Sequence, residues 1–373
     1  MYKYYLLIFI IFSIILFCQN KRIIYLYEFF KYSFIYSLIS YLLKISIKNK
    51  IFIKFNKVLI CIFVFMYIFD IKYFYYKDKN KDLLENRYYI AANLYNNENI
   101  LPTWIYEINR FIDYTGKENI YISIVENKST DKTKKILSKW KSDLDKKGVN
   151  NNIKIGFKEN IKKENDERIT YLSFLRNEVL SDLYKNNNFT KIIFLNDILF
   201  VAEDIINIVS TNQENYDMVC AFDYEGIGLY DIWVSRDING KVLSPLYPYF
   251  QDNKSINLLN KMEPIPVYTC WNGLVVFNSD PFYRNNISFR HSKNNECYSS
   301  ECFLIAHDLS LLGYNKIYMN PKIKVAYKYS YYFLWKELLN WKIIKYIMSF
   351  IKYKKELPKI TYTNNYYECI ESL

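Results

Sequence analysis

Beyond residue 86, short apolar runs alternate with segments that carry apolar residues at helical spacing, and this alternation limits the fold more than any other feature. The strand-like runs lie at 87–95, 119–126, 153–157 and 191–195. The helix-like segments lie at 100–112, 129–144 and 169–183. Strands that alternate with helices of this length predict an α/β fold with a mostly parallel sheet and flanking helices.

Polar residues follow these strands at the places where parallel sheets bind ligands, the carboxyl ends of the strands. They are Asn93, Glu126, Asn127, Asn196 and Asp197. None of the eight glycines forms a G-x-G-x-x-G or Walker loop, which argues against a dinucleotide dehydrogenase or a P-loop enzyme. A nucleotide site that uses carboxylates instead of such a loop implies a divalent cation between carboxylate and diphosphate.

Two apolar runs near the start of the chain, Tyr4–Cys18 and Val58–Tyr76, predict a membrane anchor over residues 1–76. Between them, Ile23–Ile47 is apolar but carries charges, which fits an interfacial or third segment. The first run also fits the core of a signal peptide, but no small-residue cleavage site follows it. If both runs span, the basic loop between them lies in the cytosol, and the chain beyond a short linker at 77–86 lies in the lumen.

The net charge of +12 does not indicate nucleic-acid binding, because most of the excess flanks the apolar runs. Residues 1–76 hold ten Lys or Arg and two acidic residues, a net charge of +8. Basic residues in such positions set membrane topology. No nucleic-acid partner is therefore expected, and the long polar region after residue 76 argues against a multi-span transporter.

The five cysteines after the predicted anchor contain no C-x-x-C pair, and the chain has only two histidines, so no structural zinc site is expected. These cysteines are Cys220, Cys270, Cys297, Cys302 and Cys369. In an oxidising lumen some of them would pair, and their odd number leaves at least one free thiol.

The order of motifs resembles that of a GT-A glycosyltransferase. Residues 120–133 resemble the segment that contacts the nucleoside, 171–180 the Arg-Asn helix after it, and 192–200 the strand that carries a metal-binding DxD motif. Four downstream segments together resemble the fungal capsule-associated α-1,3-mannosyltransferase family, glycosyltransferase family 69. They are residues 217–241, 266–282, 299–309 and 317–327.

This resemblance implies a GT-A-like, Rossmann-like catalytic domain over residues 87–330. The apolar face and the lysines of Leu334–Lys355 predict a C-terminal amphipathic helix within a final region at 331–373, which either packs on the catalytic domain or lies on the membrane. The resemblance implies an enzyme of the Golgi or endoplasmic reticulum membrane with a lumenal catalytic domain. The expected reaction moves mannose from a GDP-mannose donor to a mannose-containing glycan acceptor, with an α-1,3 linkage, retention of configuration and Mn²⁺ or Mg²⁺. Two alternatives stay open: an inactive glycan-binding or accessory protein, and a transferase for another nucleotide sugar.

The resemblance also implies roles for single residues. Asp197 is the expected metal ligand, although the DxD position reads Leu195-Asn196-Asp197 and so lacks one carboxylate. Five residues are expected to contact the nucleotide sugar: Asn93, Glu126, Asp131, Arg176 and Asn196. The candidate catalytic carboxylates are Asp223, Glu301 and Asp308.

Trp271 and Asn272 are the expected acceptor-binding residues, because an indole stacks on the C–H face of a sugar and an amide bonds its hydroxyls. Glu301 and Asp308 lie seven residues apart, two helical turns, so they share a helix face. One of them is expected to face the sugar or acceptor, and the other to cap the helix or form an ion pair.

Each of these residues has a simpler structural alternative. Asp197 fits a turn at a strand end, and Glu126 fits a cap of the helix that follows it. Arg176 fits a surface arginine, and Trp271, taken alone, fits a core tryptophan. His307 is expected to be a surface or core residue and no ligand.

Overall fold

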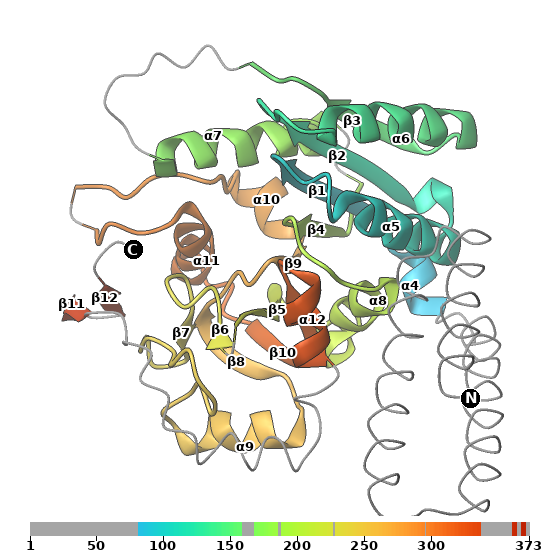
Figure 1. Cartoon of the computed structure of the whole chain (residues 1–373). Helices are drawn as coiled ribbons and strands as arrows, with labels where there is room; N and C mark the ends of the chain where they lie inside the picture. Colours follow the sequence, from blue (N-terminus) through green and yellow to red (C-terminus); the bar gives the residue numbers. More distant parts are fainter. Residues whose placement is uncertain are drawn as a thin grey trace, which may run out of the picture. The chain divides into compact units, whose positions relative to one another are not determined.

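The computed structural model of the chain describes seven ranges, which belong to one compact unit, Lys81–Leu373 (Figure 1). These ranges are residues 81–158, 168–185, 188–226, 228–294, 296–336, 360–363 and 367–370. Among them, no helix has the length and apolar character needed to cross a membrane. The predicted anchor segments Tyr4–Cys18, Ile23–Ile47 and Val58–Tyr76 lie outside the described residues.

Ten strands form the central sheet, in the order β3-β2-β1-β4-β9-β5-β10-β8-β7, with β6 paired to β5 (Figure 1). Their bounds are β1 Tyr88–Leu94, β2 Ile120–Glu126, β3 Asn150–Lys154, β4 Lys191–Leu195, β5 Met218–Glu225, β6 Gly228–Leu229, β7 Arg236–Asp237, β8 Ile265–Thr269, β9 Leu274–Asn278 and β10 Ile317–Ala326. Two short strands near the end of the chain pair separately, β11 Ile360–Thr363 and β12 Glu368–Ile370.

The sheet is mixed, so the predicted α/β architecture is confirmed while the prediction of a mostly parallel sheet holds only for one half. Strands β3, β2, β1 and β4 are all parallel, as in a Rossmann-like sheet. In the other half, β9 runs antiparallel to both of its neighbours, β4 and β5, and β8 runs antiparallel to β10. A central strand covered on both faces has a continuous apolar sequence in either direction, so the sequence pattern does not show its polarity.

Helices cover both faces of the sheet and enclose two hydrophobic cores. Helices α5, α6 and α8 pack on one face, and α7, α10 and α11 on the other. The helices are α4 Lys81–Glu85, α5 Leu101–Thr115, α6 Thr133–Lys147, α7 Arg168–Leu180, α8 Ala202–Val209, α9 Asn253–Lys261, α10 Asp280–Asn285, α11 Glu301–Leu311 and α12 Tyr329–Lys336. The predicted apolar helix faces are confirmed, for example by the buried side chains of Trp104 and Ile108 on α5.

Local sequence explains where the elements begin and end. Helix α5 has a proline in its first turn and ends at Gly116, whose φ of 93° is accessible to glycine at little cost. The strand predicted at 153–157 lies three residues earlier, at Asn150–Lys154. Its backbone pairs with β2 from Tyr121 to Val125, and this pairing overrides the polar character of its three asparagines.

Two disulfides tie loops to the sheet. Cys220–Cys270 joins β5 to the residue after β8, and Cys297–Cys369 joins the segment before α11 to β12. Cys302 is a buried free thiol, so the prediction from the odd number of cysteines is confirmed. Of the predicted C-terminal amphipathic helix, the structure describes only the part up to Lys336, where α12 ends.

Candidate active site

The β4 strand ends in Asn196 and Asp197, which lie against the connection between β8 and β9. The backbone N–H of Asn196 donates to the Gly273 carbonyl at 2.8 Å. Gly273 has a φ of 74°, and a Cβ there would lie 2.8 Å from the Ile198 side chain, so only glycine allows this close approach. The side-chain amide of Asn196 makes two hydrogen bonds of 3.4 Å. Its Oδ1 accepts from Trp271 Nε1, and its Nδ2 donates to Tyr327 Oη.

Asp197 is half-buried at this strand end. Its Oδ2 accepts a hydrogen bond of 2.9 Å from Asn97 Nδ2. Burial raises the pKa of Asp197, and the Asn97 bond and the nearby charge of Arg176 oppose that rise. The Asn97 bond holds the carboxylate of Asp197 in place, and the positive charge of Arg176 acts on it. A turn residue that only faces solvent has no such partners.

Asp197 fits a divalent cation that the substrate shares. Among the described residues, no group of three or more His, Cys, Asp or Glu side chains could hold a metal ion. Mg²⁺-like cations at phosphate sites are commonly held by one or two carboxylates together with phosphate oxygens. The single carboxylate of Asp197 therefore matches a cation that binds together with a diphosphate.

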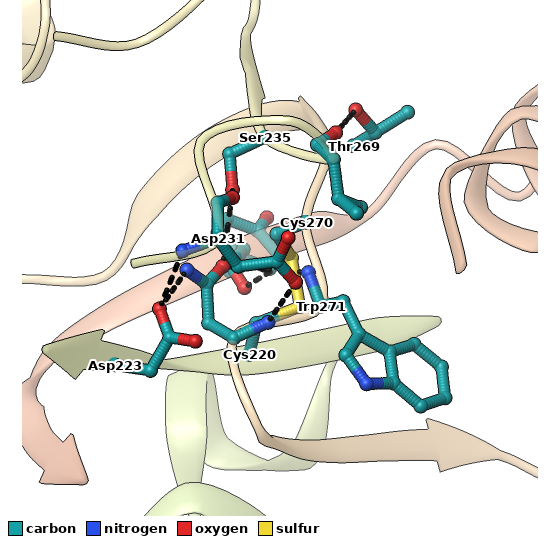
Figure 2. The surroundings of a disulfide bond; sticks show 10 residues. Cys220, Asp223, Asp231, Ser235, Thr269, Cys270 and Trp271 are labelled. Carbon is teal, nitrogen blue, oxygen red and sulfur yellow. Dashed lines mark hydrogen bonds between the residues drawn. A yellow bond between two sulfur atoms is a disulfide. The ribbon is translucent and has the colours of Figure 1, made fainter. Parts of the chain in front are cut away.

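Asp223, at the end of β5, is fully buried and linked to a second carboxylate, Asp231 (Figure 2). Asp223 Oδ1 accepts hydrogen bonds from Asn272 Nδ2 at 2.7 Å and from the backbone N–H of Asp231 at 3.3 Å. Tyr327 Oη donates to Asp223 Oδ2 at 3.5 Å. The backbone N–H of Asn272 donates to Asp231 Oδ2 at 3.4 Å, so Asn272 connects the two acids.

The two carboxyl groups interact strongly. Burial raises the pKa of Asp223, with the bond from Asn272 opposing the rise. Burial and then the charge of Asp223 raise the pKa of Asp231, and Glu301 adds to this while Arg176 opposes it. Raised pKa values of neighbouring acids occur at many functional sites, because burial and a nearby like charge disfavour the ionised form.

Arg176 supplies the positive charge of the cluster. Its Nε donates to Glu301 Oε1 at 2.8 Å, and its guanidinium lies 4.4 Å from the centre of the Trp271 ring. Glu301 is the first residue of α11 and is 1% exposed; Ser300 caps this helix by accepting from the backbone N–H of Cys302 at 3.2 Å. Arg176, whose side chain is 12% exposed, is therefore a paired, largely covered arginine and not a solvent-facing one.

Two predicted nucleotide-contacting residues at and just after the end of β2, Glu126 and Asp131, accept hydrogen bonds from backbone N–H groups. Glu126 is fully buried, and its two oxygens accept backbone N–H bonds from Ser129 at 2.8 Å and Gly156 at 2.6 Å. Glu126 therefore holds two loops together and does not cap α6, and its contact with a base stays a prediction. Asp131 accepts from the backbone N–H groups of Glu98 and Thr133, each at 2.9 Å.

Burial would raise the pKa of Asp131, but its bonds from Thr133 and Glu98 outweigh burial, so the pKa is lowered. Asn93 differs from these acids. Its Nδ2 donates to the Leu175 carbonyl at 3.0 Å, while its buried Oδ1 has no hydrogen-bond partner among the described residues. Asn93 therefore has one buried acceptor atom that no described residue satisfies.

Asp308 forms an ion pair with Arg290, and its predicted catalytic role stays a prediction. Arg290 Nε and Nη2 donate to its two oxygens, each at 2.7 Å. Helix α11 carries both Glu301 and Asp308. Glu301 joins the cluster, and Asp308 forms an ion pair, one of the two roles expected for the second acid. His307 is buried and its Nδ1 bonds the Tyr268 hydroxyl at 2.6 Å, which confirms it as a core residue.

The predicted acceptor platform is corrected. Trp271 is 1% exposed and packs against Phe194 and Phe289, with ring centres 5.3 and 5.6 Å away. Because Arg176 and these rings cover the indole, no sugar can stack on it. Asn272 is fully buried and positions Asp223 instead of facing an acceptor.

Two members of the cluster, Asp231 and Tyr327, were not singled out by sequence. Asp231 lies in an irregular loop, so no strand or helix pattern indicates its direction. One signal was present: a carboxylate stands among the large apolar residues Leu229, Tyr230, Ile232 and Trp233. The acid cluster therefore consists of Asp223 and Asp231, the residues Asn272 and Tyr327 that bond them, and Arg176 with its partner Glu301. Asp197, at the β4 end, is a carboxylate suited to a cation that also binds the diphosphate.

The sequence of the chain is similar to that of a curated protein. The alpha-1,3-mannosyltransferase CMT1 of Cryptococcus neoformans is 28% identical over 270 residues, which cover 65% of this chain. The matched region spans 58% of the length of that relative.

Several solved structures share a general likeness. The mannosyltransferase PcManGT from Pyrobaculum calidifontis, in complex with GDP-Man and Mn²⁺, has a TM-score of 0.37 and 11% identity, over 65% of this chain and 56% of its own. TarS 1-349 of S. aureus has a TM-score of 0.36 and 16% identity, over 64% and 60%. At these scores we infer nothing about this chain from either structure.

The family model described as Cryptococcal mannosyltransferase 1 matches residues 87–308, which is more than half of the chain and includes β1, β4, β5 and α11. The match contains Asp197 and every carboxylate of the cluster. The chain belongs to the Cryptococcal mannosyltransferase 1 family.

Proposed function

We propose that this protein is a GT-A-type glycosyltransferase that moves mannose from GDP-mannose to a mannose-containing glycan, with an α-1,3 linkage and retention of configuration. The observation that carries the proposal is the link between the β4 end, where α/β sheets bind ligands, and the acid pair: Tyr327 bonds Asn196, the neighbour of Asp197, and also Asp223. Family membership supports the same reaction class.

The roles of the residues follow from charge. The leaving group of such a transfer is a nucleoside diphosphate, whose developing negative charge dominates the barrier. A divalent cation, Mn²⁺ or Mg²⁺, held by Asp197 would neutralise part of that charge. The positive charge of Arg176 opposes the rise in the pKa of both Asp197 and Asp231. Glu301 fixes the orientation of Arg176 through their 2.8 Å bond.

The donor is tested by turnover of nucleotide sugars. The purified chain is incubated with GDP-mannose, UDP-glucose or UDP-N-acetylgalactosamine, with Mn²⁺ or with chelator, and release of the nucleoside diphosphate is measured. Faster turnover of GDP-mannose, dependent on the cation, is expected. Turnover of a UDP-sugar alone would assign a different donor, and no turnover of any donor would favour an inactive glycan-binding protein.

Asp197→Asn is expected to lower transfer by at least ~100-fold, the effect of losing about 3 kcal/mol of charge stabilisation in the transition state. Since burial raises the pKa of Asp197, the neutral variant should unfold at the same temperature as the wild type or slightly higher. Mn²⁺ with GDP should raise the melting temperature of the wild type but not of the variant.

The matched control is Asp280→Asn, which changes an exposed carboxylate on α10 that pairs with Arg284. This control should keep both activity and the Mn²⁺-dependent stabilisation. Wild-type activity that persists in excess chelator would remove the cation from the proposal.

We further propose that the catalytic unit works in the lumen of the Golgi or endoplasmic reticulum, attached to the membrane through residues 1–76. The two disulfides support an oxidising compartment. Protease protection of a C-terminal tag in sealed microsomes is the test, and digestion without detergent would overturn this topology.

A further inference from the structure

Three aromatic side chains lie at the surface beside the acid cluster. Tyr230 and Tyr298 are 47% and 46% exposed, and Trp233 is half-buried. The Trp233 and Tyr298 rings lie 6.2 Å apart at 32°, and the Tyr230 ring lies 4.8 Å from that of Tyr327. Single exposed aromatic residues are ordinary, but three around one functional cluster are a specific feature.

These rings belong to the two segments that also supply carboxylates. Tyr230 and Trp233 flank Asp231 in the loop between β6 and β7, and Tyr298 lies three residues before Glu301. Tyr327, against which Tyr230 packs, bonds both Asp223 and Asn196. Tyr230 therefore reaches the cluster through Tyr327, and the Trp233–Tyr298 pair lies on the two chain segments that carry Asp231 and Glu301.

Asp231 has unused capacity to bind a ligand. It is half-buried, and the backbone N–H of Asn272 donates to its Oδ2. Its Oδ1 accepts no hydrogen bond from any described residue. Asp223, by contrast, is fully buried and has both oxygens occupied. Of the two acids, Asp231 is the one that can reach a bound molecule.

The chemistry of these groups matches a sugar. A pyranose ring has an apolar C–H face that packs on aromatic rings, and hydroxyl groups that donate to carboxylate oxygens. The indole that sequence suggested for this purpose, Trp271, is covered by Arg176 and neighbouring rings, whereas Trp233 and Tyr298 lie at the surface.

We propose that Tyr230, Asp231, Trp233 and Tyr298 form the acceptor subsite, which holds a hexose residue of the glycan. The C–H face of the hexose packs against the Trp233–Tyr298 pair, and one of its hydroxyls donates to Asp231 Oδ1. This inference rests on the proposed transferase function and identifies the surface that receives the acceptor.

The test uses the full chain and two probes, methyl α-mannoside and α-linked mannobiose. Trp233→Ala and Tyr298→Ala should each raise the KM for mannobiose about tenfold, the equivalent of about 1.4 kcal/mol, while the KM for donor stays within twofold. Asp231→Asn should also raise the KM for mannobiose. Trp233→Phe keeps an aromatic ring, so its KM for mannobiose should lie closer to that of the wild type than to that of Trp233→Ala. Tyr184→Ala, at a tyrosine 40% exposed beyond α7, is the matched control and should behave as the wild type.

Saturation-transfer NMR with mannobiose gives a readout that needs no turnover. The wild type and Tyr184→Ala should show transfer to the sugar C–H protons, and Trp233→Ala should lose most of it. Turnover of donor with unchanged acceptor KM and unchanged NMR signal in the variants would overturn the subsite alone. If the wild type turned over no donor, the proposed function would fail, and loss of the NMR signal in Trp233→Ala would still decide the subsite.

Discussion

Two acids at and just after the end of β2 in the parallel half of the sheet, Glu126 and Asp131, have an environment opposite to that of Asp223 and Asp231 in the other half. Glu126 and Asp131 each accept two hydrogen bonds from backbone N–H groups, so their charges are matched where they lie. Asp223 is fully buried and Asp231 is half-buried, and burial raises the pKa of both. The first pair stabilises loops, whereas the second holds charge at a cost to stability, which is typical of sites that bind or react.

The disulfides give the largest expected effect on stability. Replacing Cys220 and Cys270 by serine should lower the free energy of unfolding by about 2–4 kcal/mol. The matched control removes Cys297 and Cys369. Their separations of 50 and 72 residues predict losses that differ by only about 0.3 kcal/mol.

Activity should distinguish the two disulfides. Cys220 lies three residues before Asp223, and Cys270 lies two residues before Asn272, which bonds both acids. The first disulfide therefore joins the segment of Asp223 to the segment of Asn272 (Figure 2). Turnover measured well below both melting temperatures should fall further without this disulfide. Equal losses of turnover would show that it does not position the cluster.

Much of the fold could be predicted, because β1, β2 and β4 are apolar runs and α5 and α6 have one apolar face. The position of Asp197 also followed from sequence, since sheet topology places ligands at strand ends. The covering of Trp271 did not follow, because Phe194, Phe289 and Arg176 reach it from separate segments of the chain. The ion pair of Asp308 depends in the same way on Arg290, which comes from a loop without periodicity.

Glu126→Gln should destabilise the protein by about 1–3 kcal/mol, because a Gln side chain places an N–H group where one of two backbone donors needs an acceptor. Denaturant unfolding measures this loss. The KM for donor should change little, since the carboxylate serves the backbone. Glu118→Gln, at an exposed position, should change stability by less than about 0.5 kcal/mol. A donor KM that rises strongly in Glu126→Gln would restore the role in nucleotide recognition.

Asp223→Asn should have the smallest effect, and in the opposite direction. Burial raises the pKa of Asp223 above its ordinary value of 3.8, so the folded state binds more protons than the unfolded state above that pH. Wild-type stability should therefore fall as the pH rises from about 4 through the raised pKa of the folded state. The variant has no charge to bury, and its amide oxygen still accepts from Asn272.

The free energy of unfolding of Asp223→Asn and of the wild type should nearly coincide at pH 4 and separate as the pH rises, with the variant more stable by about 1 kcal/mol or more at pH 8. Urea titrations at several pH values measure this slope. Asp280→Asn, at an exposed acid, should follow the wild type at every pH. A wild type that gains stability over the same range would show that Asp223, like Glu126, has its charge fully matched, and the contrast between the two halves would disappear. Turnover should fall in Asp223→Asn even where stability rises, because the charge that costs stability is the one that acts on Asp231.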